Sequence, residues 1–585
     1  MVLLNKNLKK ILKITAESSL IYLTLVLLLS FLSGSVVYLK TERLLGTAFI
    51  VVLISYLYKN RKEYFISWGI LYFLLCSVVF PYFIVDEHQT LQPMIKYMNV
   101  VGCISCFVIL TTSFISNKIL KKSLFILYMI PLLLLVMIFW GYYFSMNATF
   151  AADTLLAVMQ TNFREAKEYL TDYFSLQGSI AVLTVLLVGV GMWLNIKCLE
   201  LCKGNKYSLH FVFVLSLASL LICYSGRQNI VFKIFLDAEK NLQKYADFQK
   251  KQSERKNHIK TDLQIQKNTK GVYILVIGES QNKDNMSAYG YARKTTPWLE
   301  EAVQQNNFIN FTKAYSCHTH TVPVLTYALT AKNQYNNLPL ASSISIIEAA
   351  EAAGYETVWL SNQVKYSAWD TPITVIASEA NQQSWLNRNI GETTGTSVYD
   401  LNLVNEIDLL KNSEKMLIVI HLMGNHSSYE ERYPQNFAVF GSKGIDKYDN
   451  SILYNDYVVS KIYERVQKLS GFKCMIYFAD HADAAKDGLG HDSGRFIWPM
   501  THIPLYMVFS KDFMREEQNL IANLRNSSDK IFTNDLVFNL LLGIMRIKIP
   551  SLYEPENDIT NTTYNFDVQR FKTLYGKKMI KDDLK

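Results

Sequence analysis

Acidic and imidazole side chains follow short apolar runs in the second half of the sequence, and together they have the composition of a metal site. Glu279 follows the run Val272–Ile277, and Asp480 and His481 follow Cys474–Phe478. Carboxylate oxygens and an imidazole nitrogen suit zinc and leave a fourth position for a reactive group. One Glu or His in a loop is weak evidence, so the inference depends on the joint placement.

A hydroxyl nucleophile is expected in the stretch 315–326, which contains three threonines, Thr319, Thr321 and Thr326. This stretch leads into an expected helix over Val324–Leu329. A hydroxyl at a helix N-terminus gains from the positive end of the helix dipole, which favours both an alkoxide and an incoming phosphate. The alternative is that one of these threonines only caps the helix. Chemistry and spacing leave all three threonines open.

The elements that must hold these groups alternate between short apolar runs and helical stretches. The runs lie at Val272–Ile277, Glu356–Leu360, Leu417–Ile420 and Cys474–Phe478. This alternation predicts a mainly parallel sheet sandwiched by helices, in which ligands bind at the carboxyl ends of the strands. His426 follows the third run and His491 follows the fourth, so both are expected near the same edge.

The first part of the chain is dominated by long apolar stretches, and a membrane-spanning helix needs about 20 such residues. We predict seven spans, of which the shorter Leu44–Tyr58 is the weakest. The other six are Ser18–Leu39, Tyr64–Val85, Tyr97–Asn117, Ser123–Phe144, Tyr173–Ile196 and Tyr207–Gly226. The sequence therefore predicts an N-terminal α-helical transmembrane bundle followed by a C-terminal α/β domain.

Basic residues flank alternate spans and predict the topology. They lie on the side that the positive-inside rule makes cytoplasmic, at Lys6, Lys9, Lys10, Lys13, Lys59, Arg61, Lys62, Lys118, Lys121, Lys122, Lys197, Lys203 and Lys206. Seven crossings place the later part of the chain outside. We expect a transmembrane domain over 1–226 with an outer loop at 146–173, a bridging segment at 227–270 that includes a helix over Asp237–Lys260, and a catalytic domain over 271–585.

The charge distribution argues against a nucleic-acid-binding protein, and the cysteine usage argues against a disulfide framework. The net charge of +9 is moderate, and the basic residues gather at segment ends, unlike the basic groove of a nucleic-acid binder. Cys317 and Cys474 are the two cysteines of the later half, and we favour buried free thiols over a disulfide between them. Thr161 and Glu165 share one side of a helical turn in the outer loop, where an amphipathic interfacial helix is the simplest interpretation.

Two motifs make the later half resemble the bacterial phosphoethanolamine transferases of the alkaline phosphatase and sulfatase superfamily, which include lipid A-modifying and mobile colistin-resistance enzymes. The first is Val276-Ile-Gly-Glu-Ser280, and the second is the stretch from Met286 to Pro297 with the letters MSAYGYARKTTP. Later blocks follow in that family's order: Thr321, Gly424-Asn-His426, Asp480-His481, His491 and His502-Ile-Pro504.

The resemblance implies roles for individual residues. Glu279, Asp480 and His481 would ligate one tightly held zinc ion together with Thr321, the covalent nucleophile. His426 and His491 would contact phosphoryl oxygens or a second metal ion and act in proton transfer. Thr161 and Glu165 would help to hold the ethanolamine group, and Asn362 and Gln363 lie where that family has a polar contact.

The same resemblance implies transfer of phosphoethanolamine from phosphatidylethanolamine to a lipopolysaccharide acceptor, at lipid A or a core sugar. The enzyme would be a multi-pass, monomeric protein of the bacterial inner membrane with its catalytic domain in the periplasm. Transfer to periplasmic glucans is an alternative acceptor, and a glycerophosphate transferase of the lipoteichoic-acid-synthase type is an alternative reaction. A sulfatase would need cysteine or serine in a Cys/Ser-x-Pro-x-Arg motif, whereas this chain has Thr321-Val-Pro-Val-Leu325. A degenerate sensor would require ligand losses that the sequence does not show.

Overall fold

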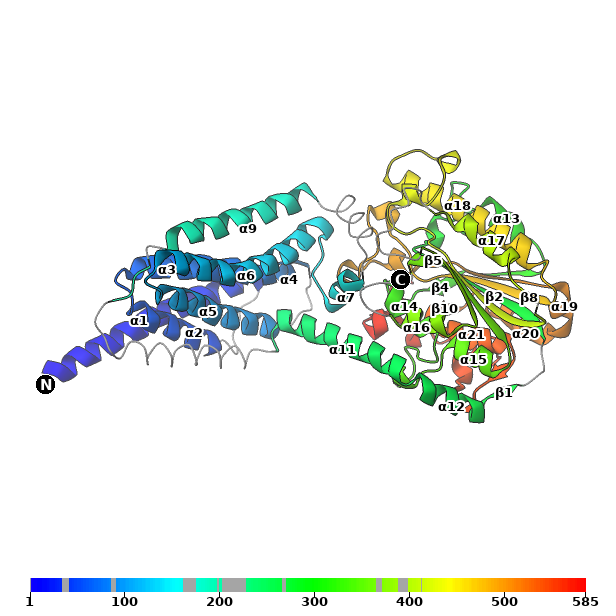
Figure 1. Ribbon diagram of the computed structural model, residues 1–585, viewed down its shortest axis with the longest axis horizontal. Coiled ribbons are helices and arrows are strands. Elements are labelled where there is room, and N and C mark those ends of the chain that lie inside the picture. The colour runs from blue at the N-terminus through cyan, green and yellow to red at the C-terminus, as the bar shows by residue number, and fades with distance from the viewer. Residues whose placement is uncertain are drawn as a thin grey trace. The chain divides into compact units, whose positions relative to one another are not determined.

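A computed structural model describes residues 2–33, 42–85, 91–160, 175–196, 199–202, 228–265, 270–364, 371–387, 398–411 and 413–584. These residues fall into two compact units (Figure 1), one within Met1–Leu155 and Tyr173–Glu239, the other within Leu156–Asp172 and Lys240–Lys585. The first unit is helical, and the second contains the sheet.

The helices of the first unit bear out much of the expected membrane pattern. They are α1 (Val2–Ser33), α2 (Glu42–Ser55), α3 (Arg61–Cys76), α4 (Phe80–Val85), α5 (Leu91–Ser113), α6 (Lys118–Met146) and α9 (Leu176–Asn195). The helix α7 (Ala152–Gln160) begins in this unit and ends in the second. Within the described residues, four stretches are long and apolar enough to cross a membrane: Arg61–Ile84, Gln92–Ser113, Lys118–Met146 and Leu176–Asn195.

The structure describes one of the other three predicted spans in full, one in part and one not at all. Leu44–Tyr58 corresponds to the shorter apolar helix α2. Ser18–Leu39 is described only as far as Ser33, inside α1. Tyr207–Gly226 lies outside the described residues, so the total of seven stays a prediction.

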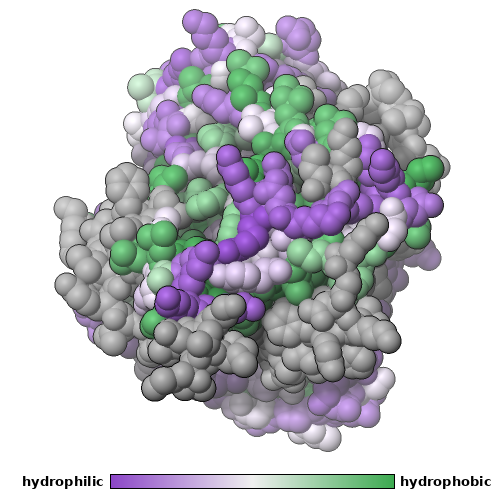
Figure 2. Space-filling view, turned by 90° about the vertical axis from the view of Figure 1, so that its left-hand side faces the viewer, coloured by the Kyte–Doolittle hydropathy of each residue, from purple (hydrophilic) through white to green (hydrophobic). Residues whose placement is uncertain are grey.

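Large apolar side chains point outward on the helices of this unit. On α6, Ile119, Leu127 and Ile130 are more than half exposed, and on α9 so are Leu176 and Leu187. Figure 2 shows hydrophobic residues exposed in several patches between hydrophilic ones. Because apolar side chains gain little by facing water, exposure on long apolar helices is what a lipid-facing surface requires.

The expected bridging helix over Asp237–Lys260 is two helices. They are α11 (Ile230–Lys250) and α12 (Gln252–Asp262), which meet at Lys251. Most residues of α12 are polar, and its two buried residues are Arg255 and Ile259. These two side chains attach the helix to the rest of the second unit.

The sheet of the second unit has seven strands in the order β3-β9-β8-β2-β7-β5-β6. Their bounds are β2 (Gly271–Gly278), β3 (Phe308–Phe311), β5 (Glu356–Val364), β6 (Gln382–Asn387), β7 (Lys415–His421), β8 (Phe472–Ala479) and β9 (Leu505–Phe509). The pairs β2–β7, β2–β8, β5–β7 and β5–β6 are parallel, and β9 pairs antiparallel with β8 and β3. The predicted mainly parallel sheet is confirmed.

Helices cover both faces of this sheet. Along β2, which is buried throughout, alternate side chains enter different cores: Tyr273 and Leu275 one, Val272 and Ile274 the other. The first core contains α14 (Thr321–Ala328), α15 (Ile346–Ala352), α16 (Pro372–Glu379), α19 (Lys511–Glu516), α20 (Gln518–Ser527) and α21 (Val537–Ile544). The second contains α13 (Pro297–Ala302), α17 (Leu403–Asp408) and α18 (Gly444–Val466). This is why the strands read as continuous apolar runs.

A buried ion cluster fixes α12 to the sheet unit. The Arg255 guanidinium lies 3.0 Å from Glu348 and 3.4 Å from Glu379, and all three side chains are at most 2% exposed. Arg255 also donates to the backbone oxygens of Phe248 and Ala341. Burial and the neighbouring Glu348 raise the pKa of Glu379 to about 7.

Removing the Arg255 charge should therefore destabilise the second unit. We expect Arg255→Met to cost about 3 kcal/mol, because two buried carboxylates lose their counter-charge. The measurement is thermal unfolding of the full chain in detergent micelles at pH 7.

The matched control is Lys256→Met, which removes a half-exposed partner of Glu351 and should cost less than about 1 kcal/mol. The deficit of Arg255→Met should shrink at pH 5, where unpaired glutamates of raised pKa become protonated. An equal effect of the two substitutions would contradict the cluster's role.

Candidate metal and nucleophile site

Glu279 follows β2 at a sharp change of chain direction. The next residue, Ser280, is buried and has φ 54°, in the left-handed region that a residue with a side chain seldom adopts. Its backbone N donates to Asp480 Oδ1 at 3.1 Å, and its carbonyl accepts from the Tyr448 hydroxyl at 2.6 Å. These two bonds, from β8's end and from α18, hold the bend that aims Glu279.

Asp480 and His481 follow the neighbouring strand β8. Val276 and Ile277 of β2 lie in register with Tyr477 and Phe478, so the two strands end side by side. His481 Nε2 lies 3.2 Å from Glu279 Oε1 and 3.4 Å from Asp480 Oδ2. The ligand atoms of these three buried residues all lie within 4.8 Å of one another.

The structure distinguishes the three threonines. Thr321 Oγ1 lies 3.2 Å from Glu279 Oε2 and 3.2 Å from His481 Nε2, at the first residue of α14. Thr326 donates to the Val322 carbonyl within the same helix, and Thr319 is fully buried with no hydrogen-bond partner for its hydroxyl in the described part of the chain. Only Thr321 of the three is brought to the carboxylates.

The helix begins earlier than the sequence pattern predicted. We expected it over Val324–Leu329, but α14 covers Thr321–Ala328, which puts Pro323 in its first turn. Proline is tolerated there because the first-turn N–H groups have no partner inside the helix. The hydroxyl therefore sits on the helix terminus itself.

The loop after β7 approaches Glu279 closely at Gly424. This glycine has φ 53°, and a Cβ there would lie 2.8 Å from the Glu279 backbone N. The buried Asp400 accepts from the backbone N of Met423 at 2.9 Å and of Gly424 at 2.8 Å. These two bonds fix the loop that backs Glu279.

Asn362 and Gln363 hold the same loop. Asn362 Nδ2 donates to Asp400 Oδ1 at 2.8 Å, and Gln363 Nε2 donates to the Leu422 carbonyl at 2.8 Å. Gln363 thus contacts the loop directly and Asn362 supports it through Asp400, and the contact of either residue with a substrate stays a prediction. Thr161 and Glu165 lie outside the described residues.

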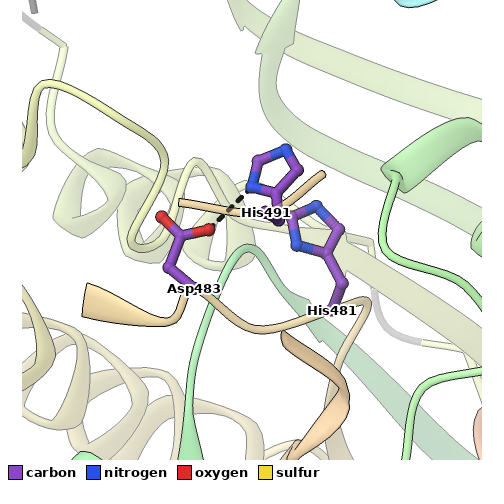
Figure 3. A group of neighbouring side chains, drawn as sticks. All are labelled: His481, Asp483 and His491. Carbon is purple, nitrogen blue, oxygen red and sulfur yellow. Dashed lines mark hydrogen bonds and ion pairs between the residues drawn. The ribbon is translucent and has the colours of Figure 1, made fainter. Parts of the chain in front are cut away.

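A second group of possible metal ligands adjoins the first. His491 Nδ1 lies 2.6 Å from Asp483 Oδ1, and its ring centre is 3.9 Å from that of His481 (Figure 3). His481, Asp483 and His491 offer ligand atoms that all lie within 4.8 Å of one another. Asp483 also accepts from the Tyr429 hydroxyl at 2.6 Å.

Electrostatics separate the imidazoles into two kinds. Burial lowers the pKa of His481 to about 4 and that of His426 to about 3, so both are neutral at pH 7. Burial also lowers the pKa of His491, but the Asp483 carboxylate outweighs it and raises the value to about 9. His491 is therefore the protonated imidazole of the group.

The carboxylates fit a cation. Burial, with the nearby Glu279 adding to it, raises the pKa of Asp480 to about 7, and burial also raises the pKa of Glu279. Asp480 Oδ2 is buried and accepts no hydrogen bond from any residue that the structure describes. Two buried carboxylates beside a neutral imidazole match the oxygen and nitrogen donors that zinc prefers.

Sequence reasoning gave no role to Asp483, Asp400 or Tyr448. Asp483 stands two residues after His481, and its place in the run Asp-His-Ala-Asp was the available signal. Asp400 and Tyr448 act through backbone groups of remote segments, and no local pattern marks such partners. Cys317 and Cys474 are both buried free thiols, as predicted.

Comparison with known proteins identifies relatives of this chain. Residues 272–541 match the Sulfatase family model. The chain is 27% identical over 387 residues to the phosphoethanolamine transferase EptC of Escherichia coli (strain K12), covering 60% of this chain and 67% of that one. It is 29% identical over 311 residues to the phosphoethanolamine transferase EptA of Helicobacter pylori, covering 49% and 56%.

A solved structure shares the fold. The integral membrane lipooligosaccharide phosphoethanolamine transferase A of Neisseria meningitidis superposes with a TM-score of 0.58 at 20% identity, covering 87% of this chain and 97% of that one. The predicted fold class and the resemblance to phosphoethanolamine transferases are confirmed.

Gly424 gives a test of the site's construction. We expect Gly424→Ala to displace Glu279, because the new Cβ would meet the Glu279 backbone and the residue would keep a positive φ. The measurement is zinc content of the purified full chain by mass spectrometry of the metal, which should fall at least about tenfold with the loss of one ligand.

Gly290→Ala is the matched control, since Gly290 also has a positive φ, 96°, but a Cβ there meets nothing within 4 Å. Its strain should slightly lower the unfolding temperature and leave the zinc content unchanged. Full zinc content in Gly424→Ala would disprove the packing argument.

Proposed function

We propose that this sulfatase-family domain transfers phosphoethanolamine from phosphatidylethanolamine to a glycolipid acceptor, lipid A phosphate or a core sugar, through a covalent intermediate on Thr321. The carrying observation is the position of Thr321 Oγ1, 3.2 Å from both Glu279 and His481 at the start of a helix. The similarity to enzymes named phosphoethanolamine transferases supports the choice of the transferred group.

The metal part of the proposal rests on the donor set. Glu279, Asp480 and His481 would hold one zinc ion, which when bound supplies Lewis acidity and lowers the pKa of a hydroxyl beside it. The His481, Asp483 and His491 group offers a place for a second ion, and its alternative role is to contact phosphoryl oxygens. His491 would therefore either bind a second ion or contact the phosphoryl oxygens.

Thr321 is the proposed nucleophile of the first displacement. Its hydroxyl would first lose its proton to solvent; the resulting alkoxide then attacks phosphorus, and the bond from phosphorus to the diacylglycerol oxygen breaks. Thr321 is the first residue of α14, so the positive end of the helix dipole would favour the phosphate's negative charge. The step leaves phosphoethanolamine on Thr321 and releases diacylglycerol.

His491 and His426 are the proposed groups for proton transfer and charge stabilisation. His491, protonated because of Asp483, would give its proton to the departing diacylglycerol oxygen. His426 is neutral at pH 7 and would donate one N–H to a phosphoryl oxygen. In the second displacement an acceptor oxygen attacks phosphorus, its proton passes to His491, and the bond to Thr321 breaks.

The setting of the site supports lipid substrates. The same chain carries at least four stretches that are long and apolar enough to cross a membrane, so a donor and an acceptor anchored in one bilayer would share a plane with the enzyme. We propose the bacterial inner membrane, with the second unit in the periplasm and the enzyme working as a monomer. Thr161 and Glu165 remain the proposed contacts of the ethanolamine group, and Asn362 and Gln363 remain proposed polar contacts of the substrate.

Alternative reactions differ in the group found on the threonine. A glycerophosphate transferase would leave glycerophosphate on Thr321, and transfer to periplasmic glucans would leave the lipid fraction unchanged. A sulfatase would need cysteine or serine where Thr321 stands.

The first test follows the product in cells. We expect lipopolysaccharide from cells that express the wild-type chain to gain the mass of phosphoethanolamine, and Thr321→Ala to abolish that gain because the attacking oxygen is gone. Mass spectrometry of separated lipid A and core fractions makes the measurement.

Thr319→Ala and Thr326→Ala are the matched controls and should keep the modification, because neither hydroxyl reaches Glu279 or His481. Thr321→Ser should keep part of it. Modification by Thr321→Ala would overturn the nucleophile assignment, and a mass gain of glycerophosphate would overturn the choice of group.

The second test uses pH. In Asp483→Asn the pKa of His491 should fall toward its usual value near 6.5, because the carboxylate that raises it is lost. Diacylglycerol release, which needs the protonated imidazole, should then decline at a lower pH than in the wild type, with the greatest deficit near pH 8.

The profile is measured with phosphatidylethanolamine in mixed micelles between pH 6 and pH 9. Tyr429→Phe is the control, since it removes another hydrogen bond to Asp483 but leaves the carboxylate in place. An unshifted alkaline limb in Asp483→Asn would exclude His491 as the proton donor.

A further inference from the structure

The amide side chain of Asn534 lies where the loop that carries the nucleophile meets the end of β8. Asn534 follows β10 (Ile531–Thr533), which pairs in parallel with β4 (Lys313–Tyr315), beside α14 (Figure 1). Residues 316–320, here called the nucleophile loop, lead from β4 to Thr321. Because the last residues of β4 and β10 lie in register, Asn534 stands next to the start of this loop. Its side chain is fully buried.

This one amide contacts both halves of the site. Asn534 Nδ2 donates to the backbone oxygen of Asp480 at 2.6 Å, and its Oδ1 accepts from the backbone N of Cys317 at 2.9 Å. The reverse orientation of the amide would bring donor against donor and acceptor against acceptor, so the two bonds fix which atom faces which partner. Because Oδ1 and Nδ2 belong to one planar group, the amide joins the Asp480 carbonyl to the nucleophile loop at a fixed separation.

On the Asp480 side, the amide completes the restraint of a proposed zinc ligand. The backbone N of Asp480 donates to the Gly278 carbonyl at 3.0 Å. Asp480 Oδ1 accepts from the backbone N of Ser280 at 3.1 Å and from that of His481 at 2.7 Å. With its carbonyl bonded to Asn534, Asp480 is held at every polar atom except Oδ2, which accepts no hydrogen bond from the described residues.

On the other side, the amide completes the restraint of the start of the nucleophile loop. The backbone N of Ser316 donates to the Thr501 carbonyl at 2.8 Å, and Thr573 Oγ1 donates to the Ser316 carbonyl at 2.8 Å. The amide then supplies the acceptor for the backbone N of Cys317. Since the same short loop leads directly to Thr321, a displaced loop start would move the Thr321 hydroxyl away from the carboxylates.

A general structural role is the alternative for any buried amide, and Asn450 of α18 has such a role. Asn450 is also fully buried, its Oδ1 accepts from the backbone N of Phe440 at 2.9 Å, and its Nδ2 donates to the Gly441 carbonyl at 3.0 Å. These are the same kinds of bonds, but they join α18 to a loop that carries none of the residues assigned to the site. Asn534 differs in that its partners are a proposed zinc ligand and the nucleophile loop.

We propose that Asn534 is a positioning residue for the transfer reaction, because it holds Asp480 and the loop of Thr321 at a fixed separation. The inference rests on the proposed function, in which the Thr321 oxygen must be aimed at phosphorus beside the carboxylates. A misplacement of about 1 Å can cost on the order of a hundredfold in rate. In this role Asn534 acts through its two backbone partners and not through the substrate.

The test compares Asn534→Leu, which removes both bonds, with Asn534→Asp, which keeps the acceptor for Cys317 and loses the donor to Asp480. Diacylglycerol release from phosphatidylethanolamine in mixed micelles gives kcat and KM for the purified full chain. We expect both substitutions to lower kcat by at least about tenfold and to leave KM within about twofold, because the substrate's own contacts are kept. Asn534→Asp has nearly the size of the natural residue, so it decides the test if Asn534→Leu does not fold.

A second readout does not depend on turnover. Co²⁺ bound in place of zinc absorbs visible light according to the geometry of its ligands. We expect the cobalt spectrum of both Asn534 variants to differ from that of the wild type. Asn450→Leu is the matched control: it should lower the unfolding temperature about as much as Asn534→Leu does, whereas its kcat, KM and cobalt spectrum should match those of the wild type.

Wild-type kcat and a wild-type cobalt spectrum in the folded Asn534 variants would overturn the inference. An increase in KM alone, an equal loss of kcat in Asn450→Leu, or a wild-type chain that binds no Co²⁺ would overturn it as well. If the wild type binds Co²⁺ but releases no diacylglycerol, the proposed function fails, and the cobalt spectra alone then decide whether Asn534 positions Asp480.

Discussion

Two buried carboxylates that lie side by side set the main electrostatic constraint on the second unit. Glu279 and Asp480 are at most 1% exposed, and their proximity is costly unless a positive charge lies between them. Each surrounding feature serves this arrangement. The strained Ser280 aims one carboxylate, the ends of two adjacent parallel strands bring the pair together, and burial keeps His481 neutral and able to ligate. A site with two uncompensated carboxylates is suited to bind a cation. The same carboxylates make the cation-free protein less stable.

Much of this could be predicted because parallel strands impose it. A polar residue directly after a buried parallel strand emerges at the sheet's carboxyl edge, so the sequence alone predicts that Glu279 and Asp480 lie together. The apolar alternation likewise predicted β2, β5, β7 and β8, whose register the structure gives. The antiparallel β9 was not predicted, because its apolar sequence gives no information on direction.

The remainder depended on contacts between distant segments. Asp400 grips the loop after β7 through backbone N–H groups, and Tyr448 reaches Ser280 from α18 across 168 residues of sequence. Neither bond requires a particular neighbour in the chain, so no motif announces it. The start of α14 was also misplaced by three residues, although Pro323 in the first turn was a usable signal. The sequence therefore predicted the residues that carry the chemistry, but not the residues that orient them.

The Arg255 cluster affects which residues the second unit needs in order to fold on its own. Its guanidinium comes from α12, ahead of β2, and neutralises two glutamates inside the sheet unit. A fragment cut at Gly271 would keep both acids and lose their only described arginine partner, together with the Phe248 carbonyl that fixes it. The smallest part of the chain able to fold autonomously should therefore start ahead of Phe248. The helix α12 is thus a structural component of the second unit. Proteolytic cleavage within α12 would therefore destabilise the fold of that unit.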